Sequence, residues 1–191
     1  MSNNIRIIGL AGTFASGKDT LADYLVAHKN FYHVSTGDII REESMKLHGS
    51  TDRVYLREVA NQMRSERGPG VTIEIGMERF SGLQEDYDGI VFSGIRSLGE
   101  AEKLQGLGGQ LLFVDADKKL RYQRAFTRGR DQADVTFEDF QKSEALEMNK
   151  PMDNKTDQNI GGLQQLADIR LSNNGDLENF YSDAVQKLDL R

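Results

Sequence analysis

The feature that most constrains this chain is a glycine-rich stretch near its N-terminus that contains a lysine. It comprises Gly12, Thr13, Phe14, Ala15, Ser16, Gly17, Lys18, Asp19 and Thr20, and matches the pattern G-x-x-x-x-G-K. An apolar strand pattern over residues 5–10 precedes it, and an amphipathic helix pattern over 18–29 follows it. Glycines let backbone N–H groups converge on phosphate oxygens, the helix N-terminus adds positive potential, and the lysine reaches the β- and γ-phosphates. The sequence therefore predicts that this stretch binds ATP or another nucleoside triphosphate.

Two positions depart from the usual pattern of a phosphate-binding loop. The residue after Lys18 is normally a Ser or Thr whose hydroxyl binds Mg²⁺, but here Asp19 takes that place and Thr20 follows. Many P-loop proteins also carry an Asp after the third strand, where this chain has Ser93. We expect Asp19 and Thr20 to help position Mg²⁺, with Asp19 replacing the carboxylate absent at Ser93. Asp19 could equally cap its own helix.

Composition narrows the classes of function. The chain has 191 residues, a net charge of −6 and no cysteine, which excludes disulfides, thiolate metal sites and a cysteine nucleophile. An acidic chain repels the phosphate backbone, so nucleic acid is not an expected partner. No stretch approaches the roughly 20 apolar residues that span a membrane, and the first residues lack a signal-peptide pattern. We therefore expect a cytoplasmic protein without membrane contact.

Apolar strand patterns alternate with helix patterns along the rest of the chain. Strands are predicted over 5–10, 31–34, 90–92, 111–114 and 168–171. Helices are predicted over 18–29, 38–48, 52–66, 71–80, 98–106, 117–128, 136–149 and 160–167, with a closing helix after Gly175. This alternation is typical of an α/β fold with a parallel sheet covered on both faces. We predict a three-layer P-loop NTPase fold with a five-stranded parallel sheet, whose ligands bind beyond the carboxyl ends of the strands.

Polar and basic residues follow the second predicted strand. Thr36 or Asp38 can cap the next helix, and Arg41, one turn into it, can clamp a monophosphate with its guanidinium. Further along, Arg57 and Arg64 share one face of a predicted helix. That face suits either a phosphate-binding cleft or an ordinary solvated surface.

A second group of arginines follows the fourth predicted strand. Arg121, Arg124 and Arg128 share one helix face, and Arg130 follows shortly after. Arginines concentrated in an acidic chain need either an acidic ligand or nearby carboxylates to neutralise them. Glu144 and Glu147, on the next predicted helix, could pair with them or shape a lid.

Taken together, these blocks resemble small P-loop kinases over nearly the whole chain. The Gly-Lys-x-Thr ending at 17–20 and the Ser-Thr-Gly-Asp run at 35–38 resemble adenylate kinases, and the run from Ala167 to Gly175 is similar to one in dephospho-CoA kinases. The resemblance implies one domain, with a core over 1–34, 88–130 and 160–191. It also implies an acceptor-binding helical insert over 35–87 and a short lid over 128–159.

The resemblance also implies roles for individual residues. Gly94 and Arg96 are expected to hold the acceptor phosphate, although Arg96 lies one position closer to the glycine than in adenylate kinases. Asn174 is expected to border the adenine of ATP, although Asn174-Gly175 also suits a plain turn. The expected acceptor-binding residues are Thr36, Gly37, Asp38, Arg41, Arg57, Arg64, Gly94 and Arg96. The expected catalytic residues, which neutralise charge on the transferring phosphoryl group, are Lys18, Arg124, Arg128 and Arg130.

The activity implied is Mg²⁺-dependent transfer of the γ-phosphoryl group of ATP to a small-molecule nucleotide, by a monomer or weak homodimer. A nucleoside monophosphate is the expected acceptor, because a phosphate anion needs no general base. The first alternative is dephospho-CoA, whose hydroxyl would need a carboxylate base such as Asp38. The second is an ATP-binding regulatory or assembly protein without catalysis, with Ser93 marking lost chemistry.

Overall fold

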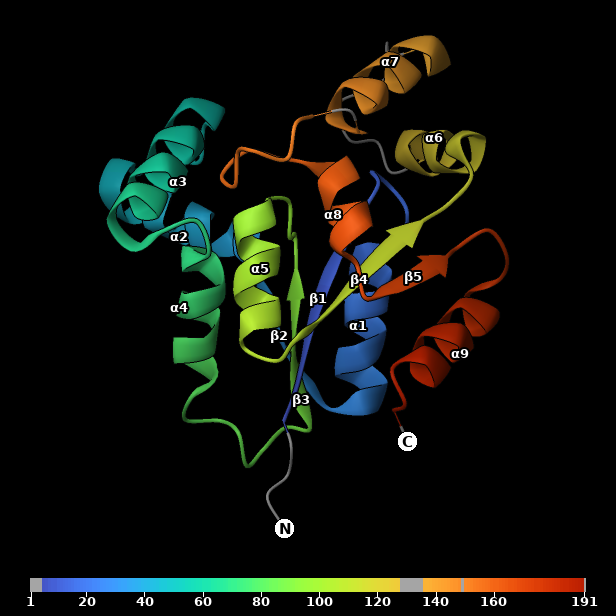
Figure 1. Ribbon diagram of the computed structural model, residues 1–191, viewed down its shortest axis with the longest axis horizontal. Coiled ribbons are helices and arrows are strands. Elements are labelled where there is room, and N and C mark those ends of the chain that lie inside the picture. Colours follow the sequence, from blue (N-terminus) through green and yellow to red (C-terminus); the bar gives the residue numbers. More distant parts are fainter. Residues whose placement is uncertain (1–4, 128–135, 149, 191) are drawn as a thin grey trace.

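One parallel sheet forms the centre of the molecule. The structure, a computed structural model, describes residues 5–127, 136–148 and 150–190 (Figure 1). The five strands are β1 (Arg6–Gly12), β2 (Phe31–Ser35), β3 (Gly89–Ser93), β4 (Gln110–Asp115) and β5 (Ile169–Ser172). Their order is β2-β3-β1-β4-β5, and every neighbouring pair is parallel. The predicted five-stranded parallel sheet is confirmed, with the strand that leads into the glycine-rich loop at its middle.

Helices cover both faces of this sheet. On one face, α1 (Lys18–Lys29) and α9 (Leu177–Lys187) bury apolar side chains such as Leu21, Leu25 and Phe180 against β1 and β4. On the other, α4 (Val71–Phe80), α5 (Leu98–Gly106) and α8 (Ile160–Leu166) pack on a second apolar cluster that includes Phe92 and Phe113. The strands therefore read as almost continuous apolar runs, because both of their faces are buried.

Four further helices lie toward the end of the molecule where the strands finish. These are α2 (Thr36–His48), α3 (Arg53–Arg67), α6 (Lys118–Thr127) and α7 (Phe137–Met148). In Figure 1, α3 and α7 stand on opposite sides of this end, while the start of β1 and the end of α9 lie toward the other end of the molecule. Helix α2 begins two residues earlier than predicted, because the Ser35 hydroxyl accepts a hydrogen bond from the Asp38 N–H (3.2 Å). Ser35 therefore caps α2, and the prediction that Thr36 or Asp38 does so is wrong.

The strand register brings the carboxyl ends of all five strands to one edge. Ser35 lies level with Ser93, and Gly12 lies level with Val114, the residue before Asp115. This edge is where ligands bind in open α/β sheets. In the described part of the chain, no helix has both the length and the apolar content needed to cross a bilayer.

Candidate active site

A cleft with a volume of ≈ 400 Å³ opens above the carboxyl edge of the sheet. Its floor is the loop between β1 and α1, from Gly12 to Asp19, and one wall is the segment from Gly94 to Arg96 after β3. The opposite wall consists of α6, α7, the first residue of α8 and the segment before it. These contribute Arg121, Ala125, Phe140, Ser143, Glu144, Glu147, Met148, Gln158 and Ile160. The cleft thus brings together the predicted phosphate loop and the predicted residues Gly94 and Arg96.

The backbone of the loop needs glycine at two positions. Gly12 has φ +144° and Gly17 has φ +105°, both values that residues with a side chain rarely adopt. A Cβ atom at Gly12 would also lie 2.0 Å from the Val114 carbonyl oxygen of β4. These glycines allow the chain to turn tightly from β1 into α1, so that the N–H groups at the start of α1 face the cleft.

Lys18 lies over this loop at the base of the cleft. Its Nζ atom donates hydrogen bonds to the carbonyl oxygens of Gly12 (3.1 Å) and Thr13 (2.6 Å). Burial lowers the pKa of the Lys18 ammonium to about 8, and the nearby charges of Arg96 and Arg121 lower it further while Asp19 and Asp115 oppose them. A partly desolvated ammonium is well suited to bind an anion, because the anion would stabilise the charge in place of the lost water.

Two residues from neighbouring strand ends hold the loop from behind. The Thr13 hydroxyl donates a hydrogen bond to Asp115 Oδ1 (2.6 Å), at the end of β4. The side-chain amide of Asn173, just after β5, donates to the Ser16 carbonyl oxygen (2.8 Å). Neither Asp115 nor Asn173 was among the predicted site residues. The sequence signal that could have identified Asp115 and Asn173 is their position at or directly after the end of an apolar strand pattern.

Arg121 is the buried cation of the opposite wall, with 1 % of its surface exposed. Its guanidinium donates to the Ala116 carbonyl oxygen (2.7 Å) and to Glu144 Oε1 on α7 (2.6 Å). It also lies 5.6 Å from the ring centroid of Phe140, within the range of a cation–π contact. The prediction that Glu144 pairs with the arginine group is confirmed, and the pair joins α6 to α7 beside the phosphate loop.

This buried pair gives a testable stability effect. We expect Glu144→Leu to lower the free energy of unfolding by about 3 kcal/mol, because the buried Arg121 guanidinium loses its hydrogen-bonded carboxylate and keeps only Asp115, whose Oδ1 lies 3.5 Å from its Nε. The double variant Arg121→Met with Glu144→Leu should recover to within about 1 kcal/mol of the wild type, since an apolar pair carries no desolvation cost. Urea denaturation measures both. The control is Glu138→Gln, which breaks an exposed pair with Lys142 on the same helix and should change little. A double variant less stable than Glu144→Leu would contradict this account.

The wall after β3 presents Arg96. Its backbone N–H donates to Glu100 Oε2 (3.0 Å), and its carbonyl oxygen accepts from the Asn159 N–H (2.9 Å). Glu100 is itself buried and accepts a further hydrogen bond from the Thr72 hydroxyl (2.8 Å). The Arg96 side chain is exposed, and among the described residues its guanidinium has no hydrogen-bond or ion-pair partner. Hydrogen bonds thus hold the backbone of Arg96 in place, while its guanidinium is available to bind a ligand in the cleft.

The predicted acceptor residues of α2 and α3 are not part of the cleft lining. Asp38 and Arg41 form an ion pair with each other in the first turns of α2, where the Arg41 Nε donates to Asp38 Oδ1 (2.9 Å). Burial opposes the change, but hydrogen bonds from Arg41 and Ser35 keep the pKa of Asp38 below its usual value. The Thr36 hydroxyl donates to the Gly94 carbonyl oxygen (2.8 Å), which joins α2 to the cleft wall. Gly37, Arg57 and Arg64 also lie outside the lining.

Comparison with known proteins shows the family to which the chain belongs. The sequence model of a family described as an AAA domain matches residues 8–149. The chain belongs to the AAA-domain family. It is 30 % identical over 187 residues to a UPF0200 protein of Sulfurisphaera tokodaii, with 96 % of each chain covered. It is 27 % identical, over the same length and with the same coverage, to a UPF0200 protein of Thermococcus kodakarensis.

Solved structures show that this AAA-domain chain has the fold of P-loop kinases. It superposes on TT1252 from Thermus thermophilus with a TM-score of 0.61 at 21 % identity, covering 96 % of this chain and 97 % of that one. It superposes on shikimate kinase from Bacteroides thetaiotaomicron with a TM-score of 0.56 at 15 % identity, covering 97 % and 99 %. A structure of shikimate kinase from Acinetobacter baumannii in complex with shikimate gives 0.55 at 15 % identity, covering 98 % and 94 %.

The remaining predicted residues of the AAA-domain chain lie away from the cleft or beyond the described ranges. Arg124 donates through Nη2 to the carbonyl oxygen of Asn173 (3.0 Å), behind the phosphate loop. Asn174 Oδ1 accepts from the Asp117 N–H (2.6 Å), which ties the β5–α9 connection to the start of α6. Thr20 is absent from the cleft lining. Arg128 and Arg130 fall outside the residues that the structure describes.

Proposed function

We propose that this AAA-domain protein transfers the γ-phosphoryl group of ATP to a nucleoside monophosphate. The observation that carries the proposal is Arg96, whose uncommitted guanidinium shares one cleft with the phosphate loop. Two cations that repel each other, Arg96 and Lys18, are stabilised together when anions lie between them. A guanidinium binds a phosphate through two parallel hydrogen bonds. An acceptor that already carries a phosphate therefore suits this wall of the cleft.

Each element of the site has a role in this reaction. The N–H groups of the loop and Lys18 hold the β- and γ-phosphates, while Arg96 aligns an oxygen of the acceptor phosphate with the γ-phosphorus. Helix α2, within the insert over 35–87, supports the acceptor side through the contact of Thr36 with Gly94. Helix α7, within the predicted lid over 128–159, lines the cleft and would help to exclude water from the transfer.

Magnesium accompanies ATP in P-loop kinases and neutralises charge on its phosphates. Asp19 offers an exposed carboxylate in the cleft, next to Lys18. Across residues 5–127, 136–148 and 150–190, no three acidic or histidine side chains gather closely enough to hold a metal by themselves. Mg²⁺ is usually bound by one or two carboxylates together with substrate phosphates and water, so a single carboxylate fits it. Asp19 is the residue of this chain that would hold it.

An acceptor hydroxyl, as in dephospho-CoA or shikimate, fits the site less well. Its deprotonation favours a carboxylate base within reach of the hydroxyl. Asp38, the candidate for that role, is paired with Arg41 and lies outside the cleft lining. Its lowered pKa also makes it a weaker base. A phosphate acceptor needs no such group.

The test is ADP formation from Mg-ATP with a panel of acceptors: AMP, CMP, dCMP, UMP, GMP, dTMP, dephospho-CoA and shikimate. We expect turnover with one or more monophosphates. Arg96→Ala should raise the acceptor KM by about 10- to 100-fold, since a charge-assisted hydrogen bond contributes about 1.5–3 kcal/mol. The KM for ATP should change far less. Arg53→Ala, an exposed arginine at the start of α3, is the matched control.

Two results would count against the proposal. Turnover with dephospho-CoA or shikimate alone would replace the monophosphate by a hydroxyl acceptor. ATP binding without turnover on any acceptor would favour the regulatory alternative.

A further inference from the structure

The carbonyl group of Ser16 points away from the cleft, toward the end of β5. It accepts a hydrogen bond of 2.8 Å from the side-chain amide of Asn173, which is 2 % exposed and does not line the cleft. We propose that Asn173 is a positioning residue for nucleotide binding, held in place by Arg124. The proposal rests on the binding of phosphates at the loop, and it assigns Arg124 to the loop rather than to the transferring group.

The planarity of the peptide bond links this contact to the ligand. In a trans peptide the C=O of one residue and the N–H of the next lie in one plane and point in opposite directions. Because the Ser16 carbonyl is held by Asn173, the Gly17 N–H is turned to the other side of the loop, where the cleft lies. Gly17 immediately precedes α1, so its N–H is among those that converge on a bound phosphate. Asn173 thereby fixes the direction of a phosphate donor without touching the phosphate.

Asn173 is itself held on two sides. Its backbone N–H donates to the Asp115 carbonyl oxygen (2.8 Å), and its own carbonyl oxygen accepts from Arg124 Nη2 (3.0 Å). Its side chain also packs so tightly on the loop that a Cβ atom at Gly17 would lie 2.3 Å from the Asn173 amide nitrogen. Because the Asn173 side chain is already ordered by these contacts, it loses little conformational entropy when it holds the loop.

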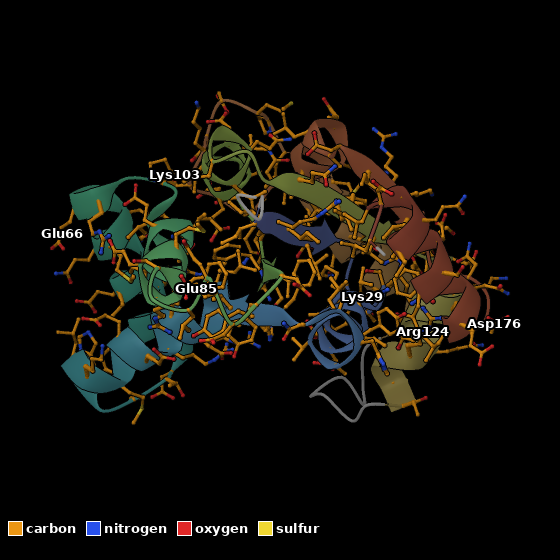
Figure 2. The ribbon with its side chains drawn as sticks, turned by 90° about the horizontal axis from the view of Figure 1, so that it is seen from below. Lys29, Glu66, Glu85, Lys103, Arg124 and Asp176 are labelled. Atoms are coloured by element: carbon orange, nitrogen blue, oxygen red, sulfur yellow. The ribbon has the colours of Figure 1, made fainter. Side chains whose placement is uncertain are left out.

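Arg124 lies on the side of the molecule that suits this role. Figure 2 shows it on the same side as Asp176, the residue that caps α9, with Lys103 of α5 and Glu66 of α3 on the other. Its guanidinium reaches the connection between β5 and α9, where Asn173 lies. We therefore expect Arg124 to influence the affinity for ATP by holding Asn173 in place.

The direct test is titration calorimetry with Mg-ATP and Mg-ADP, without any acceptor. Asn173→Ala should raise both dissociation constants about tenfold, because the Ser16 peptide loses the group that orients it. Asn179→Ala, an exposed asparagine on α9, is the matched control and should bind as the wild type does. A dissociation constant for Asn173→Ala within twofold of the wild type would overturn the proposal. Because no acceptor is present, the result is independent of whether the protein proves to be a kinase.

The near-isosteric variant Asn173→Asp separates positioning from general support of the fold. An ionised carboxylate cannot donate to the Ser16 carbonyl, whereas a protonated one can. Relative to the wild type at each pH, this variant should bind Mg-ADP much more weakly at pH 8 and regain affinity at pH 5.5. If Asn173→Ala fails to fold, the test is the dissociation constant of Asn173→Asp for Mg-ADP divided by that of the wild type at the same pH. A ratio that does not change with pH would overturn the proposal.

A double-mutant cycle tests the link to Arg124. If Arg124 acts through Asn173, the double variant Arg124→Ala with Asn173→Ala should bind Mg-ADP no more weakly than the weaker of the two single variants. Fully additive losses would show that Arg124 acts on the nucleotide by another route and would overturn that part of the proposal.

Discussion

Replacing Lys18 by alanine should reduce kcat for phosphoryl transfer by at least about 10²- to 10³-fold. The ammonium is a preorganised cation in a cleft, and loss of one such group from a phosphoryl-transfer or oxyanion site typically costs this much. ATP binding should weaken as well, because the loop loses the ammonium that donates to its Gly12 and Thr13 carbonyl oxygens. ADP release in the presence of the preferred acceptor measures the first effect, and calorimetry with Mg-ATP measures the second. Turnover by Lys18→Ala within tenfold of the wild type would contradict this mechanism.

The lowered pKa of Lys18 adds a pH dependence. Since burial brings that pKa to about 8, the free protein loses the ammonium above pH 8, and ATP affinity should fall by up to about tenfold per pH unit there. Lys18→Arg keeps its charge and should lack this inflection. Stability follows the opposite course, because the unfolded lysine keeps its proton up to about 10.5. Between pH 8 and 10.5 the unfolded state binds more protons, so the contribution of Lys18 to the free energy of unfolding should rise with pH.

Gly12→Ala should destabilise the fold by about 3 kcal/mol or more and abolish ATP binding. The new methyl group would meet the Val114 carbonyl oxygen at 2.0 Å, and this contact with the backbone of β4 cannot be relieved by a side-chain rotation. The φ of +144° adds strain. Urea denaturation and calorimetry provide the measurements. Gly106→Ala, where a Cβ meets nothing within 4 Å, should be as stable as the wild type or slightly more so. Equal stability of the two variants would show that the loop can move away from β4.

Much of this fold was predictable because its signals are local. The apolar strands and the amphipathic helices were located to within a few residues, since each is encoded by its own periodicity. The start of α2 was misplaced because Ser35, Thr36 and Asp38 are all good capping residues. Which of them caps α2 is decided partly by Gly94, far along the chain, whose carbonyl oxygen accepts a hydrogen bond from the Thr36 hydroxyl.

The arginines of α6 show where sequence reasoning stops. Spacing places Arg121 and Arg124 on one side of a helix, and of these two the sequence analysis predicts only Arg124 as catalytic. In the folded protein Arg121 is buried against Phe140 and Glu144 on the wall of the cleft, whereas Arg124 turns to Asn173 behind the loop. Helical periodicity determines the direction of a side chain from its own helix, but not which distant segment packs there.

The sequence by itself determined the phosphate loop, the parallel sheet and the edge at which a nucleotide binds, because contiguous residues encode each of them. Only the tertiary structure decided which charges meet in the cleft. It left Arg96 uncommitted there, paired Asp38 with Arg41 outside it, and placed Asp115 and Asn173 behind the loop. The contacts of Thr13 with Asp115 and of Ser16 with Asn173 join residues more than 100 positions apart, and no local pattern records such contacts. Asp38 and Arg41 are neighbours on one helix, but whether their pair lines the cleft depends on how that helix packs in the folded chain.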